Sequence, residues 1–165
     1  MNIERYAAAS VVAIVSFLML VGMAIAVSDT AGTTASVSVN EFLSVTITSG
    51  APVLFGDLAD DTSDNQAEND PLTATIGAET NIGSIDVRTS ADTATFSGPG
   101  TLAVGNMKWS DALGGTYTSY TTSAADVCTG LSASQDCDIY HQISIPDNQP
   151  AGSYSVGITI TATNE

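Results

Sequence analysis

The chain has 165 residues, with 18 acidic residues, three basic residues and one histidine, so its formal net charge at pH 7 is −15. Such a charge repels nucleic acid and anionic lipid headgroups, which argues against both as partners of the folded surface. The length is sufficient for one domain once an N-terminal leader is set apart.

The first predicted element is an apolar leader at the N-terminus. Only Glu4 and Arg5 are charged before an apolar run that closes on Ala24-Ile25-Ala26. This small-x-small pattern suits a signal peptidase. We therefore expect residues 1–26 to be a signal peptide or a membrane anchor, and residues 27–165 to form a single exported β-sandwich domain.

Two interpretations besides a cleaved signal peptide stay open for the leader. In the first it is uncleaved and anchors the protein, so that membrane contact is limited to residues 1–27, a length that can span a bilayer. In the second it is a pilin-type leader, cut before the apolar run, which then becomes a filament-core helix. The small-residue site and the immediate change to a Thr-, Ser- and Gly-rich sequence favour cleavage.

The rest of the chain has the pattern of an all-β protein. Thr, Ser, Gly, Val and Ile dominate, and turn residues recur at short intervals without a helical periodicity. We expect an antiparallel two-sheet β-sandwich, jelly-roll-like, with about nine or ten strands. The predicted strands are 33–39, 42–48, 53–55, 72–76, 82–88, 93–97, 101–109, 116–121, 138–145 and 153–162.

The first predicted strand has two interpretations. Ala35, Val37 and Val39 alternate with serines, and the alternation breaks at Glu41-Phe42. A stretch of this length is long for one strand, so we divide it into two strands at that point. The strand 33–39 either pairs within its own domain or is donated to another subunit, where its apolar face would be buried.

An acidic loop is predicted over residues 56–70. Hard cations prefer carboxylate and carbonyl oxygens, and the candidate calcium ligands are Asp57, Asp60, Asp61 and Asp64. Their spacing does not match an EF-hand, and the alternative is an acidic loop that is simply solvated. No other cofactor is expected.

Cys128 and Cys137 are the only cysteines. In an exported chain an even number of cysteines predicts a disulfide, which by the chain-entropy model contributes about 2.5–3 kcal/mol for a loop of this length. A zinc site needs more ligands than these thiols and the lone His141 supply. The spacing is not Cys-x-x-Cys, which argues against a redox pair.

The last two predicted strands are expected to pair with each other in an antiparallel hairpin. Between Tyr154 and Ala162 apolar residues strictly alternate with Ser, Gly and Thr. This period-two pattern is typical of a half-buried strand, and Ile143 and Ile145 would share its buried face. His141 is in phase with that face, which predicts a partly buried ring with a hydrogen-bonded nitrogen.

The sequence contains few residues suited to catalysis. His141 is the only histidine, and no Gly-x-Ser-x-Gly elbow, phosphate-binding loop or dinucleotide fingerprint is present. Exposed aromatic platforms for glycans are limited to Trp109, Tyr117 and Tyr120, and we expect Trp109 to lie in the core. The protein is therefore predicted not to be an enzyme, with a secreted hydrolase as the least favoured alternative.

Two turn-and-strand motifs carry a resemblance. They comprise Phe55, Gly56 and Leu58, and then Ile145, Pro146, Pro150, Ala151, Gly152 and Tyr154. The layout resembles exported archaeal-type surface β-sandwich proteins and is similar to WxL-type cell-wall domains and, more loosely, to TasA-type biofilm fibre and bundling-pilus subunits. Trp109 does not stand in a Trp-x-Leu motif, so wall binding of that type is not implied. The fibre relatives polymerise by donating an N-terminal strand, and residues 33–40 stand at that place.

The combined prediction is an exported, non-enzymatic structural protein at the cell surface. A fibre or pilus subunit that assembles by N-terminal strand donation is one form that this protein could take. Its expected partners are further copies of itself or another cell-surface protein. The alternative is an extracellular module that binds glycan or calcium.

Overall fold

The structure is a computed structural model, and it describes residues 36–164. The predicted signal peptide, its two alternatives and Ala35 lie outside the described residues. Within this range, the structure contains no helix with the length and hydropathy needed to cross a bilayer. One compact unit extends from Val39 to the C-terminus.

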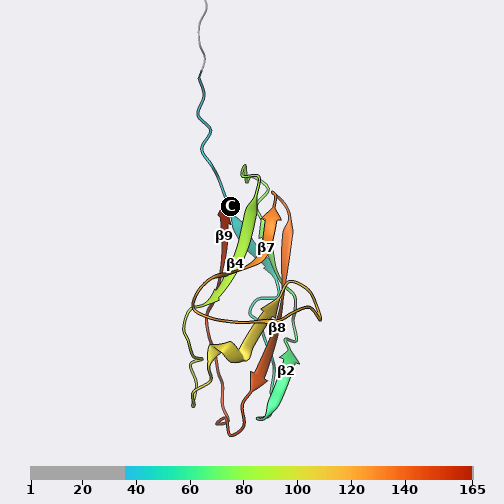
Figure 1. Cartoon of the computed structure of the whole chain (residues 1–165), viewed down its shortest axis with the longest axis vertical. Helices are drawn as coiled ribbons and strands as arrows, with labels where there is room; N and C mark the ends of the chain where they lie inside the picture. The colour runs from blue at the N-terminus through green and yellow to red at the C-terminus, as the bar shows by residue number, and fades with distance from the viewer. Residues whose placement is uncertain (1–35, 165) are drawn as a thin grey trace, which may run out of the picture. The chain divides into compact units, whose positions relative to one another are not determined.

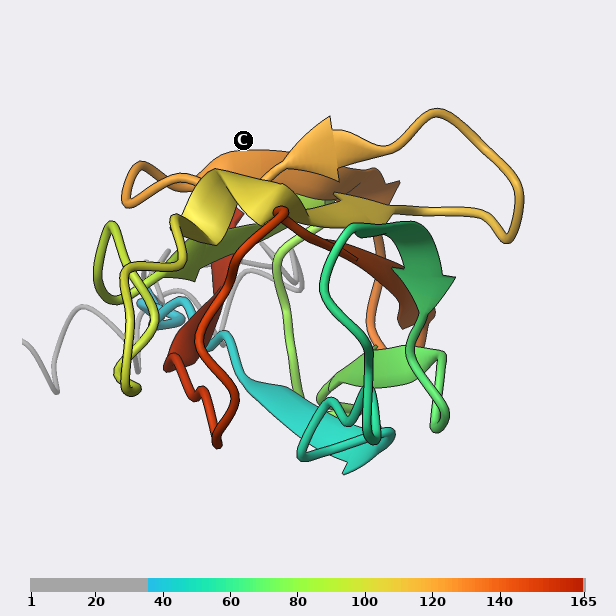
Figure 2. The ribbon, with the colours of Figure 1, turned by 90° about the horizontal axis from the view of Figure 1, so that it is seen from below.

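The compact unit is an all-β sandwich of two antiparallel sheets (Figures 1 and 2). The first sheet has the order β1-β3-β8-β5-β6, and β2 also pairs with β8. Its strands are β1 (Val45–Ser49), β2 (Thr62–Gln66), β3 (Leu72–Ile76), β5 (Met107–Ser110), β6 (Thr118–Ser119) and β8 (Asp136–Ile145). The second sheet has the order β7-β4-β9, with β4 (Ile85–Ala91), β7 (Ala125–Leu131) and β9 (Ile158–Asn164). The predicted sandwich is thus confirmed, with sheets of unequal size.

Strand β8 is the central element of the first sheet. Its first half pairs with β3, where Leu72 lies opposite Ile139, and its second half pairs with β5, where Trp109 lies opposite His141. Strand β2 pairs with the last residues of β8. It lies on the other edge of β8 from β5, because Gln142 of β8 pairs with β2 on one side and with β5 on the other. The inner face of β8 is closely covered, since every second residue from Cys137 to Ile143 is buried.

The core lies between the two sheets and follows the period-two alternation of their strands. Strand β3 buries Leu72, Ala74 and Ile76, and β4 buries Ile85, Val87, Thr89 and Ala91. Met107 and Trp109 of β5 are also buried, so the predicted core position of Trp109 is confirmed. A short 3₁₀ helix, η1 (Val104–Asn106), precedes β5 within the stretch predicted as the strand 101–109.

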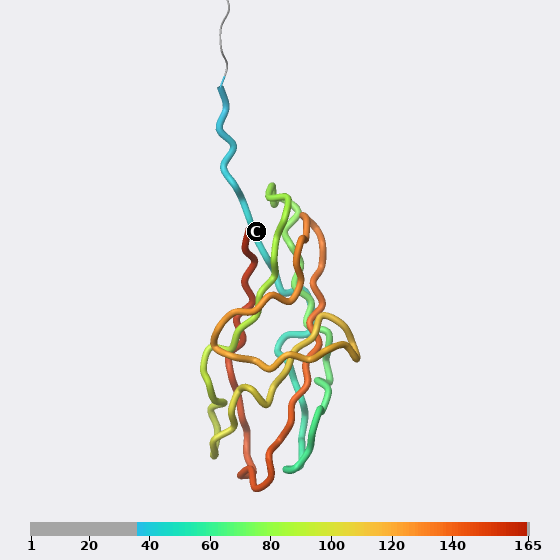
Figure 3. The backbone as a smooth tube through the Cα atoms, in the orientation of Figure 1, coloured from blue at the N-terminus to red at the C-terminus, as the bar shows by residue number. Residues whose placement is uncertain are grey.

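The predicted pairing of the last two strands is wrong. Strand β9 pairs with β4 in the opposite sheet, from Ile85 opposite Asn164 to Ala91 opposite Ile158. Figure 3 traces the chain from β8, in orange, through the turn to β9, in red. The alternation predicted which face of β9 is apolar, but it carries no information about the strand beside it.

A tyrosine holds the corner through which the chain changes sheet. The Tyr154 hydroxyl donates to the Pro150 carbonyl at 2.7 Å and accepts from Gln149 Nε2 at 2.7 Å. A Cβ added at Gly98 would lie 2.4 Å from the Tyr154 ring, so this position requires glycine. The motif that suggested a hairpin is therefore a corner between sheets.

Several other local predictions need correction. The acidic stretch 56–70 contains strand β2, whose sequence TSDNQ has no apolar pattern. The predicted strand 53–55 is not a strand, and 93–97 contributes only isolated bridges at Thr95 and Ser97. The described part of the predicted strand 33–39, residues 36–39, pairs with no strand. The segment between the two cysteines, predicted as a loop, contains the end of β7 and the start of β8.

Candidate functional site

An open groove lies between the segment before β9 and the segment after β1. It has a volume of about 1080 Å³, and its walls are residues 149–156 and 52–60. In Figure 2 these two walls are the red ribbon that leads into β9 and the cyan-to-teal ribbon that follows β1. The lining also includes core side chains that are at most 9% exposed, namely Phe96, Leu102, Met107 and Ile143. The groove thus reaches down to the hydrophobic core.

The wall that leads into β9 is an open sheet edge. Ser155 exchanges main-chain hydrogen bonds with Ser97 at 2.8 and 3.0 Å, and the Gly157 carbonyl accepts from Asp92 N–H at 2.9 Å. Consecutive residues of an extended chain direct their main-chain groups to opposite edges. Tyr154 and Val156 therefore direct theirs to the other edge, and no hydrogen bond among the described residues uses them.

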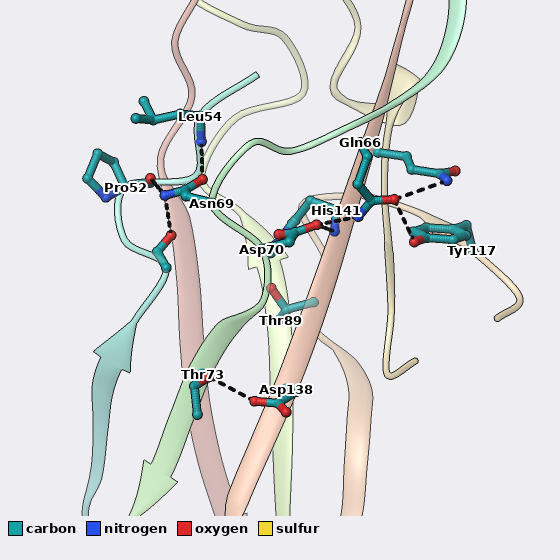
Figure 4. A network of polar contacts seen from close by, with 12 residues as sticks. Pro52, Leu54, Gln66, Asn69, Asp70, Thr73, Thr89, Tyr117, Asp138 and His141 are labelled. Atoms are coloured by element: carbon teal, nitrogen blue, oxygen red, sulfur yellow. Dashed lines mark hydrogen bonds and ion pairs between the residues drawn. The ribbon is translucent and has the colours of Figure 1, made fainter. Parts of the chain in front are cut away.

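The opposite wall is not held by a strand but by the Asn69 side chain and by one main-chain hydrogen bond, from Glu68 N–H to the Leu54 carbonyl at 2.7 Å. Asn69 Nδ2 donates to the Gly50 and Pro52 carbonyls at 3.0 and 2.5 Å, and Asn69 Oδ1 accepts from Leu54 N–H at 2.9 Å (Figure 4). Leu54 is still 50% exposed. The next apolar residues, Phe55 and Leu58, are half-buried against the core. Both walls therefore present apolar side chains to a space that no strand fills.

A chain of buried polar groups crosses the sandwich beside the groove floor, and Figure 4 shows one part of it, Asp70 beside His141. His141 Nδ1 is 2.9 Å from Asp70 Oδ1, and Asp70 Oδ2 accepts from the His141 main-chain N–H at 2.5 Å. On the other side of the ring, His141 Nε2 is 3.0 Å from the Tyr120 hydroxyl, which accepts from Thr89 Oγ1 at 3.1 Å. Because His141 belongs to β8 and Thr89 to β4, the chain of contacts connects the two sheets.

One pattern of donors and acceptors satisfies the whole polar chain. With a neutral ring protonated on Nδ1, His141 donates to Asp70 and accepts from Tyr120, which in turn accepts from Thr89. His141 is 0% exposed, and the Asp70 side chain is 6% exposed. Burial is the largest cause that raises the pKa of Tyr120, and the Asp70 charge adds to it. The predicted hydrogen-bonded histidine is confirmed, and its burial is complete.

The arrangement of acid, histidine and hydroxyl is similar in composition to a catalytic triad, but its geometry is that of a structural bridge. A triad needs a nucleophile that can reach a substrate carbonyl, whereas Tyr120 and Thr89 are each 1% exposed. Asp70 was not predicted as the partner of His141. An available signal was its position two residues before the buried strand 72–76, because a buried histidine requires an acceptor nearby.

The structure does not gather the candidate calcium ligands. Asp57 and Asp60 line the groove, whereas Asp64 makes an ion pair with Lys108 at 2.9 Å. Asp61 and Asp64 both have a positive φ, at the irregular start of β2. Within residues 36–164, no group of three or more His, Cys, Asp or Glu side chains is placed to hold a metal ion. Calcium binding at these four carboxylates stays a prediction from sequence.

The predicted disulfide is present between Cys128 and Cys137, with the Cα atoms 5.9 Å apart. Cys128 lies in β7 and Cys137 in β8, so the disulfide connects the two sheets. Cys137 is 1% exposed. The spacing of the cysteines indicated only that the disulfide closes a short loop, and it did not indicate that the disulfide connects two sheets.

The described residues of the candidate donor strand are uncovered. Val37 is 88% exposed and Val39 is 76% exposed. Directly after them the chain is clamped by Asn81, whose side chain donates to the Asn40 carbonyl at 2.8 Å and accepts from Phe42 N–H at 2.7 Å. The chain directly after the candidate donor segment is therefore fixed to the domain.

The site is thus an apolar groove with an open sheet edge, in a domain that also carries an uncovered alternating segment. Comparisons of the chain with family models, with curated proteins and with solved structures found no match.

Proposed function

We propose that this protein is an exported, non-enzymatic structural subunit of the cell surface that assembles into fibres by donating the N-terminal strand 33–39. The observation that carries the proposal is the exposure of Val37 and Val39, at 88% and 76%. Both alternate with serines in the sequence, and the described part of the segment, residues 36–39, pairs with no strand.

Burial of these valines would drive assembly. Covering one aliphatic side chain of this size contributes about 1.5–3 kcal/mol. Adding the segment to a sheet of another subunit would also satisfy its main-chain groups. An alternating strand without a cover is a liability for a monomer, because it pairs with other chains.

The rest of the domain suits a structural subunit whose two sheets are firmly connected. The disulfide between Cys128 and Cys137 and the polar chain through His141 each connect the two sheets. The acid, histidine and hydroxyl groups are buried and mutually satisfied, which supports a structural role for them.

Assembly of the chain from residue 27 onward tests the proposal. Size-exclusion chromatography and negative-stain electron microscopy over a range of concentrations should show oligomers and fibres. A chain that starts at Asn40 should stay monomeric. The full-length variant V37D/V39D should also stay monomeric, whereas S36T/S38T, with polar substitutions on the other face, should still assemble. Strict monomers of the unmodified chain at every concentration would contradict the proposal.

A further inference from the structure

We propose that the groove between residues 52–60 and 149–158 is the acceptor for residues 33–40 of a second copy of this chain. In this arrangement the incoming strand pairs with the open edge that Tyr154 and Val156 present. The inference rests on the proposed function for the identity of the donor, and it adds the place where the donor binds.

The apolar contents of the groove match the donor in pattern. In a strand, side chains on one face repeat about every 6.6–6.8 Å, which Ala35, Val37 and Val39 would adopt once the donor segment is extended in the groove. The half-buried Val156 and Ile158 in one wall of the groove have the same two-residue period. Small and β-branched side chains suit a groove whose floor is already packed with core residues.

The main chain of the groove wall is ready to accept a strand. Tyr154 and Val156 have unpaired main-chain groups on the groove side, and β9 is the last strand of its sheet in the described part of the chain. Strand addition at such an edge forms main-chain hydrogen bonds with little dependence on side-chain identity. An extended segment is therefore a better occupant than a compact ligand.

The net negative charge of the protein favours an uncharged segment as the occupant of the groove. The basic residues of the described chain, Arg88 and Lys108, are each paired with an acid, at 2.7 and 2.9 Å. Asp57 and Asp60 line the groove, and the chain as a whole carries a net charge of −15. Residues 33–40 contain no charged side chain. An uncharged segment can enter this acidic groove without the repulsion that an acidic surface would meet.

The occupant is assigned to a second copy because the start of the domain is already committed elsewhere. Asn81 holds Asn40 and Phe42 by three hydrogen bonds of 2.7, 2.8 and 3.2 Å. Val39, directly before this clamp, is 76% exposed and does not line the groove. The chain's own valine is thus kept out of its own groove.

A binding experiment with a peptide of residues 30–40 tests the acceptor. The protein is the chain from Asn40 onward, which lacks the donor segment and keeps the compact unit except for its first residue, Val39. Fluorescence anisotropy should show saturable binding of the labelled peptide. V156D in the groove wall should weaken binding at least about tenfold, which corresponds to about 1.4 kcal/mol. The matched control L113D, at an exposed leucine that does not line the groove, should bind as the unmodified protein does.

Cross-linking provides a second readout that does not depend on the folding of V156D. Leu54 lines the groove and is 50% exposed, so L54C is expected to fold, and L113C is its control outside the groove. A peptide carrying V37C should form a disulfide with L54C at least about tenfold faster than with L113C. Equal rates for the two variants, or peptide binding that V156D leaves unchanged, would overturn the acceptor assignment.

The two proposals fail in different ways. Fibres that still form from full-length V156D would overturn the groove as acceptor and leave the structural function standing. Peptide binding in the groove without any oligomers of the full chain would support the groove and overturn the fibre function. Cross-links of full-length V37C/L54C that appear only at the mass of one chain would overturn the second copy as the occupant.

Discussion

Strands β8 and β9 share the same alternating pattern but differ in how well their inner faces are covered. On β8, Ile139 and His141 are 0% exposed. On β9, Ile158 and Ile160 are only half-buried, although both pack against the core. Period-two alternation therefore reports which face is apolar and does not report how much of that face is covered.

The difference in burial follows from the number of elements that contact each strand. Strand β8 has neighbours on both edges, a disulfide to β7 and a polar chain to β4. Among residues 36–164, strand β9 has one neighbour, β4, and its other edge continues the groove wall. The closed region can hold the sandwich together while the open region remains available to a partner.

Breaking the polar chain should have the largest effect on stability. His141→Ala removes the ring donor of the buried Asp70 carboxylate and leaves a cavity in place of a fully buried ring, which we expect to lower the free energy of unfolding by about 3–5 kcal/mol. Urea denaturation of the chain from residue 27 measures this loss. The exposed turn variant Asp147→Asn should change it by less than about 0.5 kcal/mol. A loss below about 1 kcal/mol for His141→Ala would show that the polar chain does not hold the sheets together.

A matched pair of isoleucines compares the covered and uncovered strands directly. Ile139→Ala on β8 should cost about 4 kcal/mol, and Ile158→Ala on β9 about 2 kcal/mol, because the second side chain is already partly in water. Denaturation of the chain from Asn40 measures both without an incoming strand. Equal losses would contradict the difference in cover between the two regions.

Removing the disulfide tests the closed region by a different route. Cys128→Ser/Cys137→Ser should lower the free energy of unfolding by about 2.5–3 kcal/mol, because the denatured chain regains the freedom of the closed loop. Reduction of the unmodified protein should give the same loss in thermal or urea unfolding. A stability that does not change on reduction would place the strength of this region in its packing alone.

The raised pKa of Tyr120 predicts that the free energy of unfolding falls at alkaline pH. Burial raises the pKa of Tyr120 above its ordinary value of about 10, so the unfolded state gives up its proton first as the pH rises. Stability is therefore complete below about pH 10 and falls above it. Tyr120→Phe should remove this alkaline loss but cost about 1–3 kcal/mol at neutral pH, because His141 Nε2 loses its buried donor. Urea midpoints between pH 8 and 11 distinguish the two effects.

Local periodicity predicted some elements well and missed others for a clear reason. Strand β3 was predicted with its observed bounds, because 72–76 alternates cleanly between buried and partly exposed positions. Strand β2 was missed, because TSDNQ carries no apolar signal and is ordered by its ladder to β8. The corner at Tyr154 was interpreted as a hairpin, because a turn signal does not state to which sheet the chain returns.

By itself, the amino-acid sequence determined the all-β class, the disulfide partners, the apolar face of the last strand and the lone histidine in phase with a buried face. These follow from local rules of alternation and from counting cysteines. Only the tertiary structure decided that β9 joins β4, that Asp70 is the partner of His141, and that core residues line an open groove. Such features join residues that lie far apart along the chain, and no local pattern specifies which distant segment will be the neighbour.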